Sequence, residues 1–216
     1  MKNCYKKLLF PVHIFQINIR ENQIIKDYIL QKILEIYQKE NNDVPDGWLT
    51  TNIFTTFDKK EINSYLFSEN SIIIEYYKKY INKFFDKETI FEIDDIWLNV
   101  YSNGEYQEEH THLTPDIFIP RSHFSCIHYL QFDKERHNPV TFIDPIETMR
   151  YNTLEMESNY YSSKWSPSVN EGDLLMFPPY LSHFVSPSEP TPDYSRIAIA
   201  FNLKIKKYGE MNSNGH

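Results

Sequence analysis

Three histidines carry the chemistry that is most readily predicted for this chain. His110 and His112 are separated by one residue, and His183 follows a strand-like run that ends at the Pro178–Pro179 pair. Residues i and i+2 of a β-strand project from one face, so the first two imidazoles can aim at the same point. A third imidazole from a neighbouring strand would complete a three-nitrogen site and leave other coordination positions open. This arrangement is typical of mononuclear non-haem iron sites, although zinc and nickel also accept three imidazoles.

Each of these histidines also has a plain structural interpretation. A His-x-His pair occurs by chance on protein surfaces, and His183 alone could be a hydrogen-bonded loop residue. The combination of all three is more specific than any one of them. Glu108 and Glu109, directly before His110, make the local charge acidic, which favours a cation. We therefore predict His110, His112 and His183 as metal ligands and catalytic residues.

Arg196 begins an otherwise apolar run, Ile197 to Phe201. A guanidinium on a buried strand needs a partner, because an unpaired buried charge is costly. That partner could be a carboxylate of the protein itself or a substrate carboxylate held by two parallel hydrogen bonds. Tyr129 lies in another apolar run and could either pack in the core or share that carboxylate. The residues alone leave both interpretations open.

Composition narrows the class of protein. The chain has 216 residues, 41% of them apolar and 16% aromatic, which is enough for one well-filled globular domain. A formal net charge of −8 disfavours nucleic acid as a partner. The two cysteines, Cys4 and Cys126, cannot build a disulfide framework, so a reducing cytoplasm is the expected setting. The apolar run near the N-terminus is too short for a signal peptide, and no stretch is long enough to span a membrane.

Two helices are predicted in the first 95 residues. Residues 21–40 place apolar side chains at spacings of three and four, at Ile25, Ile29, Ile33 and Ile36. The turn-rich segment 41–47 should end this helix. A second apolar stripe, formed by Ile73, Tyr76, Tyr77, Tyr80, Ile81 and Phe84, predicts a helix over residues 70–87. We expect residues 1–95 to act as helical support for a β core.

From residue 96 onward, short runs of β-branched and aromatic residues alternate with turn residues. We predict strands over 96–101, 123–132, 140–143, 173–177 and 196–205. Many short strands separated by turns favour an antiparallel sandwich or jelly roll. The expected fold is α+β, a single domain over residues 1–216 with a β core over 96–205 and a tail over 206–216.

The motifs around these residues, taken together, resemble a known family. The stretches Trp97–His112, Phe124–Leu130, Glu171–His183 and Arg196–Asn202 are similar to successive motifs of the 2-oxoglutarate/Fe(II) oxygenases common in marine phage genomes. Those proteins are distant relatives of the prolyl hydroxylases. Leu9–His13 and the turn at Asp46–Trp48 resemble the same family, so the likeness covers nearly the whole chain.

The resemblance implies a double-stranded β-helix, the cupin-like jelly roll, and a hydroxylase that uses Fe(II), O₂ and 2-oxoglutarate. It implies that His110 and His183 bind iron. It further implies that Arg196 and Tyr129 hold the distal carboxylate of 2-oxoglutarate, with Tyr101 near its keto-acid end. The substrate would be a small molecule or a peptide. A phage protein of this kind would act in the cytoplasm of its host.

His112 departs from the pattern of the wider superfamily, which has Asp or Glu at this position. Replacing a carboxylate by imidazole removes one negative charge from the ligand set. If a carboxylate does complete the coordination sphere, Asp116 is the nearest downstream candidate and Asp144 a more distant one.

Two other classes of protein fit the same residues. One is a three-histidine cupin-type metalloenzyme that uses no keto acid and needs no Arg196 in its pocket. The other is a non-catalytic jelly-roll binding module, because jelly rolls host all of these functions. Consumption of 2-oxoglutarate separates the first from the predicted hydroxylase, and metal content separates the second.

Overall fold

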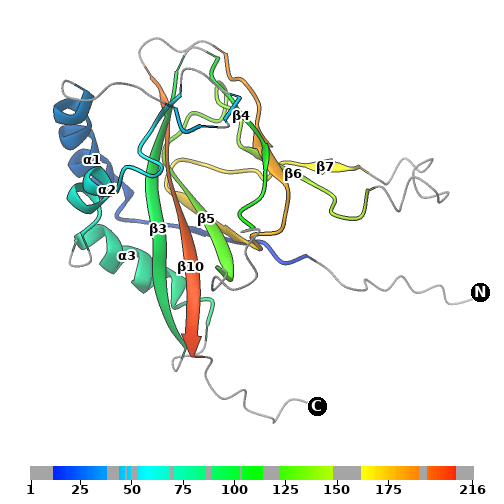
Figure 1. Cartoon of the computed structure of the whole chain (residues 1–216), viewed down its shortest axis with the longest axis horizontal. Helices are drawn as coiled ribbons and strands as arrows, with labels where there is room; N and C mark the ends of the chain where they lie inside the picture. Colours follow the sequence, from blue (N-terminus) through cyan, green and yellow to red (C-terminus); the bar gives the residue numbers. More distant parts are fainter. Residues whose placement is uncertain are drawn as a thin grey trace, which may run out of the picture.

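The computed structural model describes residues 12–37, 44–46, 48–49, 53–68, 71–85, 89–102, 104–113, 122–147, 162–189 and 194–207. In this part of the chain, two antiparallel sheets form the β core, and three helices cover the outer face of the larger sheet (Figure 1). The predicted class, an α+β fold with a double-stranded β-helix core and supporting helices, is confirmed.

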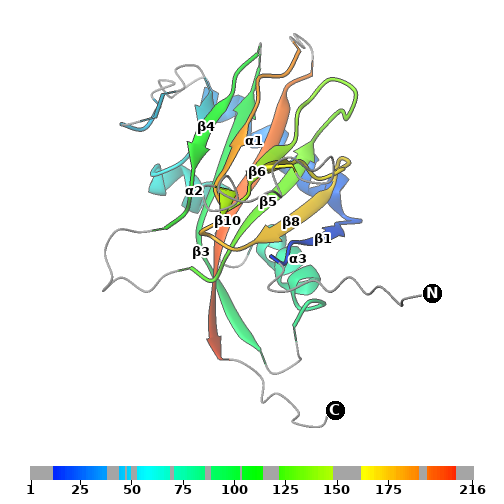
Figure 2. The ribbon, with the colours of Figure 1, turned by 90° about the vertical axis from the view of Figure 1, so that its right-hand side faces the viewer.

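The larger sheet has six strands in the order β1-β8-β5-β10-β3-β2. Figure 2 shows β10 between β3 and β5, with β8 and β1 beyond β5. The strands span Phe15–Asn18 (β1), Asp173–Phe177 (β8), Phe124–Gln131 (β5), Arg196–Lys207 (β10), Ile90–Tyr101 (β3) and Phe54–Thr55 (β2).

The smaller sheet has four short strands in the order β4-β9-β6-β7. They span Gln107–His110 (β4), His183–Val185 (β9), Val140–Ile143 (β6) and Lys164–Trp165 (β7). A core cluster joins the two sheets: Val140 and Phe142 of β6 pack with Leu175 and Phe177 of β8. This closure brings β4 and β9 over the face of the larger sheet that the helices leave open.

The helices bury the stripes that their spacing predicts. Helix α1 spans Asn22–Tyr37, and its four isoleucines at 25, 29, 33 and 36 are buried. Helix α3 spans Ile72–Ile81, and Ser71 caps it by accepting a hydrogen bond from the backbone of Ile74. A short helix α2 spans Lys60–Leu66. Among the described helices, none combines the length and the apolar composition that crossing a membrane requires.

Strand β10 separates the core from the site by simple alternation. Ile197, Ile199, Phe201 and Leu203 pack in the core shared with the helices. The residues between them line a cavity on the opposite face: Arg196, Ala198, Ala200 and Asn202. The two alanines are small, so the strand leaves room for this cavity between two polar side chains.

The N-terminal region contributes more than helical support. Strands β1 and β2 belong to the six-stranded sheet, and β3 begins at Ile90, so the expected boundary at residue 95 falls inside a strand. Helix α2 and the short strands β4, β7 and β9 were not predicted from the sequence. Strands β7 and β9 are too short to show a periodicity, and β4, with the sequence Gln-Glu-Glu-His, has none of the β-branched residues that indicate a strand. These strands depend on the partners that pair with them. The tail expected over 206–216 begins within β10 and otherwise lies outside the described residues.

Candidate metal centre and its pocket

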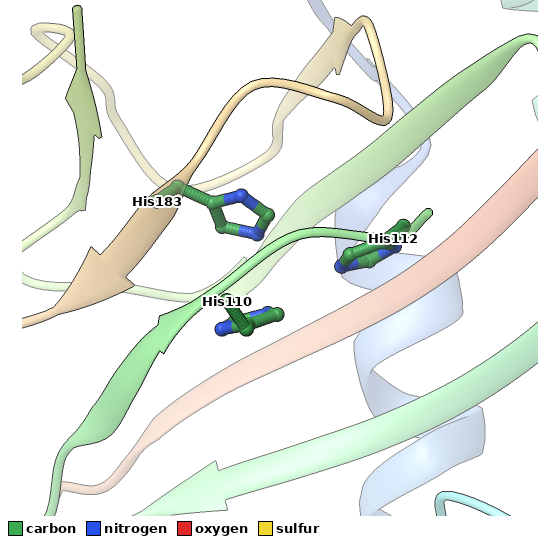
Figure 3. A group of neighbouring side chains, drawn as sticks. All are labelled: His110, His112 and His183. Carbon is green, nitrogen blue, oxygen red and sulfur yellow. The ribbon is translucent and has the colours of Figure 1, made fainter. Parts of the chain in front are cut away.

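The fold brings the three predicted histidines together. His110 ends β4 and His183 begins β9, and the two residues are direct partners in the antiparallel pair. Their ligand nitrogens and that of His112 all lie within 4.8 Å of one another. Figure 3 shows the three rings gathered around a common space. His110, His112 and His183 therefore present three imidazoles to one point, as a single metal ion requires.

His112 reaches this point by a different route from the one the sequence suggested. Strand β4 ends at His110, so the two residues do not share a strand face. Instead, the backbone N–H of His112 donates to the carbonyl of Pro179 at 2.9 Å. This bond ties the segment after β4 to the proline corner before β9. The corner thus positions His112 on one side and His183 on the other.

Each imidazole has one nitrogen engaged by the protein. Nδ1 of His110 lies 2.8 Å from the carbonyl of Glu108, and Nδ1 of His183 lies 2.9 Å from the carbonyl of Leu181. Nδ1 of His112 lies 2.9 Å from the side-chain oxygen Oδ1 of Asn202. A carbonyl oxygen only accepts, so Nδ1 of each ring carries the proton and Nε2 keeps its lone pair. Metal-binding histidines have this pattern, in which an outer hydrogen bond fixes the tautomer.

Burial keeps the three rings neutral. It lowers the pKa of His112 to about 4, and it lowers the pKa of His110 as well. Burial also holds the pKa of His183 well below its usual range, and the neighbouring histidines lower it further. Neutral imidazole is the form that binds a metal. The donor set, its tautomers and its protonation state therefore fit Fe(II), and they would also fit zinc or nickel.

The triad opens onto a cavity of about 630 Å³. Its wall includes all three histidines, Tyr101 and Arg196. The volume lies within the roughly 300–1,000 Å³ typical of small-molecule sites. The cavity is therefore large enough to hold a dicarboxylic acid and part of a second ligand.

Arg196 is buried, with 2% of its surface exposed, and its charge has no protein counter-ion in the described part of the chain. Its guanidinium lies 4.3 Å from the ring centre of Tyr101 and 5.5 Å from that of Tyr129. Among the described residues, none accepts a hydrogen bond from its Nε or Nη1. A buried cation with free donors is costly unless an anion pairs with it. The arginine therefore presents an anion-binding group to the cavity.

The two tyrosines occupy different places. Tyr101 lines the cavity, and its hydroxyl donates to Oε1 of Gln107 at 3.2 Å. Tyr129 is fully buried behind the guanidinium, outside the cavity wall, and its hydroxyl accepts from the backbone N–H of Val140 at 3.1 Å. Burial raises the pKa of both hydroxyls. Tyr129 therefore contacts Arg196 from outside the cavity, through its ring and its hydroxyl.

One of the two alternative carboxylate ligands, Asp144, does not join the site. Oδ1 of Asp144 accepts the backbone N–H of Ile146 at 3.0 Å in the turn after β6, and Asp144 is not part of the triad's cluster. Asp116 lies outside the described residues. The cluster that could hold a metal in the described part of the chain consists of the three histidines.

Three further groups in the wall were not predicted from the sequence: Asn202, Glu108 and Trp97. Asn202 shares the face of β10 on which Arg196 lies, six residues away, so its phase in the strand was a usable signal. Glu108 was noticed only as local charge, and Trp97 only as part of a motif. Their places depend on pairing between distant strands.

The residues of this site fall within a segment that known proteins share. The family model described as "Putative 2OG-Fe(II) oxygenase" matches residues 95–202, half of the 216 residues. The matched segment contains His110, His112, His183 and Arg196. A search of curated protein sequences found no match.

Solved structures share the fold at low identity. A prolyl-4-hydroxylase from Pseudomonas putida is 11% identical, with a TM-score of 0.53 over 91% of this chain and 94% of that one. The viral collagen prolyl hydroxylase of Paramecium Bursaria Chlorella virus-1, in complex with 2-oxoglutarate, is 12% identical, with a TM-score of 0.52 over 88% and 94%.

A third similar structure is HygX from Streptomyces hygroscopicus, with nickel, 2-oxoglutarate and hygromycin B bound. It is 11% identical, with a TM-score of 0.54 over 92% of this chain and 85% of that one. Likeness at these identities establishes the fold, and the family match adds the class of chemistry. The chain belongs to the family of 2-oxoglutarate/Fe(II) oxygenases, and it is a 2-oxoglutarate-dependent dioxygenase of that family.

Proposed function

We propose that this dioxygenase is a hydroxylase in which His110, His112 and His183 hold Fe(II) and Arg196 holds 2-oxoglutarate. The observation that carries the proposal is the pairing of a three-imidazole site with a buried, unpaired arginine in one cavity. When bound, Fe(II) and 2-oxoglutarate supply the oxidising chemistry that couples decarboxylation of the keto acid to hydroxylation of a substrate C–H bond.

The chain's own residues bind and orient the reactants. Arg196 offers two free donors to the distal carboxylate of 2-oxoglutarate, and a charge-assisted pair of this kind is strong and directional. Tyr101 packs its ring against the guanidinium at 4.3 Å from within the cavity, and Tyr129 packs against it from behind. The arginine is thus held in one orientation, which fixes the direction of the keto acid relative to the histidines.

The wider setting is also part of the proposal. The net charge of −8 supports a small molecule or peptide, and not nucleic acid, as the substrate. The resemblance to marine phage oxygenases supports a phage origin and action in the host cytoplasm. The core clusters, which join segments from residue 14 to residue 203, support a single domain.

Arg196→Ala tests the assignment. We expect 2-oxoglutarate affinity to fall by about 100-fold or more, because charge-assisted hydrogen bonds to the carboxylate are lost. Affinity for Zn(II) or Fe(II) should stay within about twofold, since the histidines are untouched. The affinities for 2-oxoglutarate and for the metal are both measured by calorimetric titration under anaerobic conditions. Arg136→Ala is the matched control, because it removes the same charge from an exposed residue paired with Asp133.

Turnover completes the test. The untagged protein, given Fe(II), ascorbate, O₂ and 2-oxoglutarate, should form succinate slowly even without its substrate. Equal loss of metal and keto-acid binding in Arg196→Ala would make the arginine a structural residue.

A second candidate function is a three-histidine metalloenzyme that uses no keto acid. It is favoured by one observation, the absence of a carboxylate from the described ligand cluster. Full metal occupancy with no 2-oxoglutarate binding and no succinate would select this candidate.

A further inference from the structure

The cavity continues outward from the histidines along a wall of aromatic rings. The ring centre of Trp97 lies 5.8 Å from that of His112, and the ring of Phe57 lies 5.1 Å from Trp97. Trp48 follows at 5.6 Å from Phe57. All three aromatic residues line the same 630 Å³ cavity. A ligand that extends away from the metal centre therefore passes along π faces, which attract cations as well as apolar groups.

The charges on this part of the cavity are negative. Asp95, Glu108 and Glu109 line the wall, whereas Arg196 is the sole Lys or Arg among the described lining residues. The proposed function already engages Arg196 with 2-oxoglutarate. In the described part of the chain, none of the three carboxylates forms an ion pair. Once the keto acid is bound, the remaining charged side chains among the described lining residues are all anionic.

One carboxylate oxygen of Glu108 accepts a hydrogen bond, and the other has no partner among the described residues. Its Oε1 accepts the backbone N–H of Leu49 at 3.1 Å. Its Oε2 is buried and has no hydrogen-bond partner among the described residues. A buried carboxylate oxygen without a donor is costly, and a cationic donor satisfies it best.

Trp97 has a buried hydrogen-bond donor without an acceptor among the described residues. The residue is 6% exposed, lines the cavity, and its indole N–H has no acceptor within the described segments. Indole Nε1 only donates, so it needs an acceptor oxygen. The wall thus contains one buried anionic acceptor and one buried neutral donor, and neither has a partner among the described residues.

We propose that the substrate carries a protonated amine or guanidinium group that pairs with Glu108 beside the aromatic wall, and an acceptor oxygen that binds Trp97. This inference rests on the proposed function, which places 2-oxoglutarate on Arg196. Glu108 lies two residues before His110, about 7 Å along a strand. The cation therefore lies several bonds away from the carbon that faces the metal centre, as in a lysine or arginine side chain.

The test compares matched probes on protein loaded with Zn(II) and 2-oxoglutarate, which cannot turn over. Nα-acetyl-lysine methylamide carries the free side-chain ammonium group and two amide oxygens. Nα-acetyl-norleucine methylamide has the same apolar chain without the charge. Trp48 and Trp97 line the cavity, so tryptophan fluorescence reports binding, and calorimetry gives the affinity. We expect the lysine probe to bind at least tenfold more tightly, with an affinity that falls as salt is raised.

Variants identify the group responsible. Glu108→Gln keeps the oxygen that accepts from Leu49 and removes the charge, so the lysine probe should lose about tenfold in affinity and the norleucine probe less than twofold. Glu135→Gln removes the same charge from an exposed residue outside the cavity and should change the affinity of neither probe.

A third probe tests the role of Trp97. n-Pentylamine carries the ammonium without the amide oxygens. If it binds as tightly as the lysine probe, the role of Trp97 is overturned and a free amine suffices.

Equal affinity of the lysine and norleucine probes in low salt overturns the proposal, as does a Glu108→Gln variant with unchanged lysine affinity. The proposed function is tested separately by titrating 2-oxoglutarate before any probe is added. If 2-oxoglutarate binds and the lysine preference is absent, only the substrate class is wrong. If 2-oxoglutarate fails to bind, the proposed function fails, and the two probes compared on Zn(II)-loaded protein still decide the cation site.

Discussion

At the residue scale, His112 sets the net charge of the metal-ligand set. Three neutral imidazoles leave both positive charges of a divalent metal uncompensated by the ligand set, whereas a carboxylate ligand would cancel one. The side chain that fixes His112 is Asn202, whose Oδ1 accepts from Nδ1 at 2.9 Å and also from the hydroxyl of Ser125 at 3.1 Å. Asn202 is thus a positioning residue, which acts on the metal through the orientation and tautomer of one ligand.

Asn202→Ala should weaken metal binding by about 10- to 100-fold, because His112 loses the acceptor that selects its tautomer. The measurement is a Zn(II) or Co(II) titration of the metal-free protein, with the Co(II) absorption spectrum as a second readout of ligand geometry. Ser125→Ala is the matched control, since it removes the other donor to the same oxygen and leaves His112 in place. If both variants lose affinity equally, or neither does, the positioning role is excluded.

Among the elements, the turn before β8 positions a strand that pairs with both β1 and β5 in the larger sheet. Gly172 in this turn has φ +88°, and its N–H donates to the carbonyl of Tyr129 at 2.8 Å. A Cβ there would lie 3.2 Å from both Nδ2 of Asn18 and Cβ of Asn22. The turn therefore combines a left-handed backbone with close packing against β1 and α1.

Gly172→Ala should lower the free energy of unfolding by about 2 kcal/mol or more, since backbone strain and steric crowding add. Gly104→Ala is the control: its φ is +79°, but its Cβ would meet its nearest neighbour, the carbonyl oxygen of Ser188, at 3.7 Å. This second variant should lose about 1–2 kcal/mol, from backbone strain alone. Urea unfolding of both proteins checks the difference, and equal losses would mean that α1 and β1 yield to the added methyl group.

Buried histidines couple the stability of the whole molecule to pH. Burial lowers the pKa of His112 to about 4 and that of His128 to about 3, from 6.5 in an unperturbed chain. His128 lies in the core, where its Nδ1 is 2.9 Å from the hydroxyl of Tyr77. The pKa values of His110 and His183 are lowered too. Well above pH 6.5 neither state binds these protons, and as the pH falls through 6.5 the unfolded chain binds more of them than the folded state.

Stability of the metal-free protein should therefore fall as the pH drops from 6.5 to 5.5, by about 1 kcal/mol each for His112 and His128. His110 and His183 should add to this loss in the same direction. The loss should continue until the folded-state pKa values are reached. Urea unfolding at pH 7.5, 6.5 and 5.5 in the presence of a chelator measures it, and the loss between pH 7.5 and 6.5 should be about a third of the loss between pH 6.5 and 5.5. His128→Leu should reduce the slope of the unfolding free energy against pH by the equivalent of about one bound proton. A flat profile down to pH 5.5 would show that these imidazoles titrate normally.

The sequence by itself determined the types of residue and their local periodicity. The isoleucine spacing of α1, the apolar runs of β5, β6, β8 and β10, and the fold class were all predicted, because alternation and helical spacing are encoded within a few neighbouring residues. The family of oxygenases was predicted as well, from a resemblance of motifs that the family match confirms. The metal ligands and the roles of Arg196, Tyr129 and Tyr101 stay predictions, and the metal and 2-oxoglutarate titrations above test the ligand set and Arg196.

Only the tertiary structure decided which atoms meet. His112 reaches the triad through Pro179 and not along a strand, Tyr129 lies behind Arg196, and Asn202 accepts from a histidine 90 residues away. Strand β4 is polar throughout and has none of the β-branched residues that indicate a strand, so it is defined by its pairing with β9. These contacts depend on how the two sheets close and in which register, which is set by the core as a whole and by no single stretch of sequence.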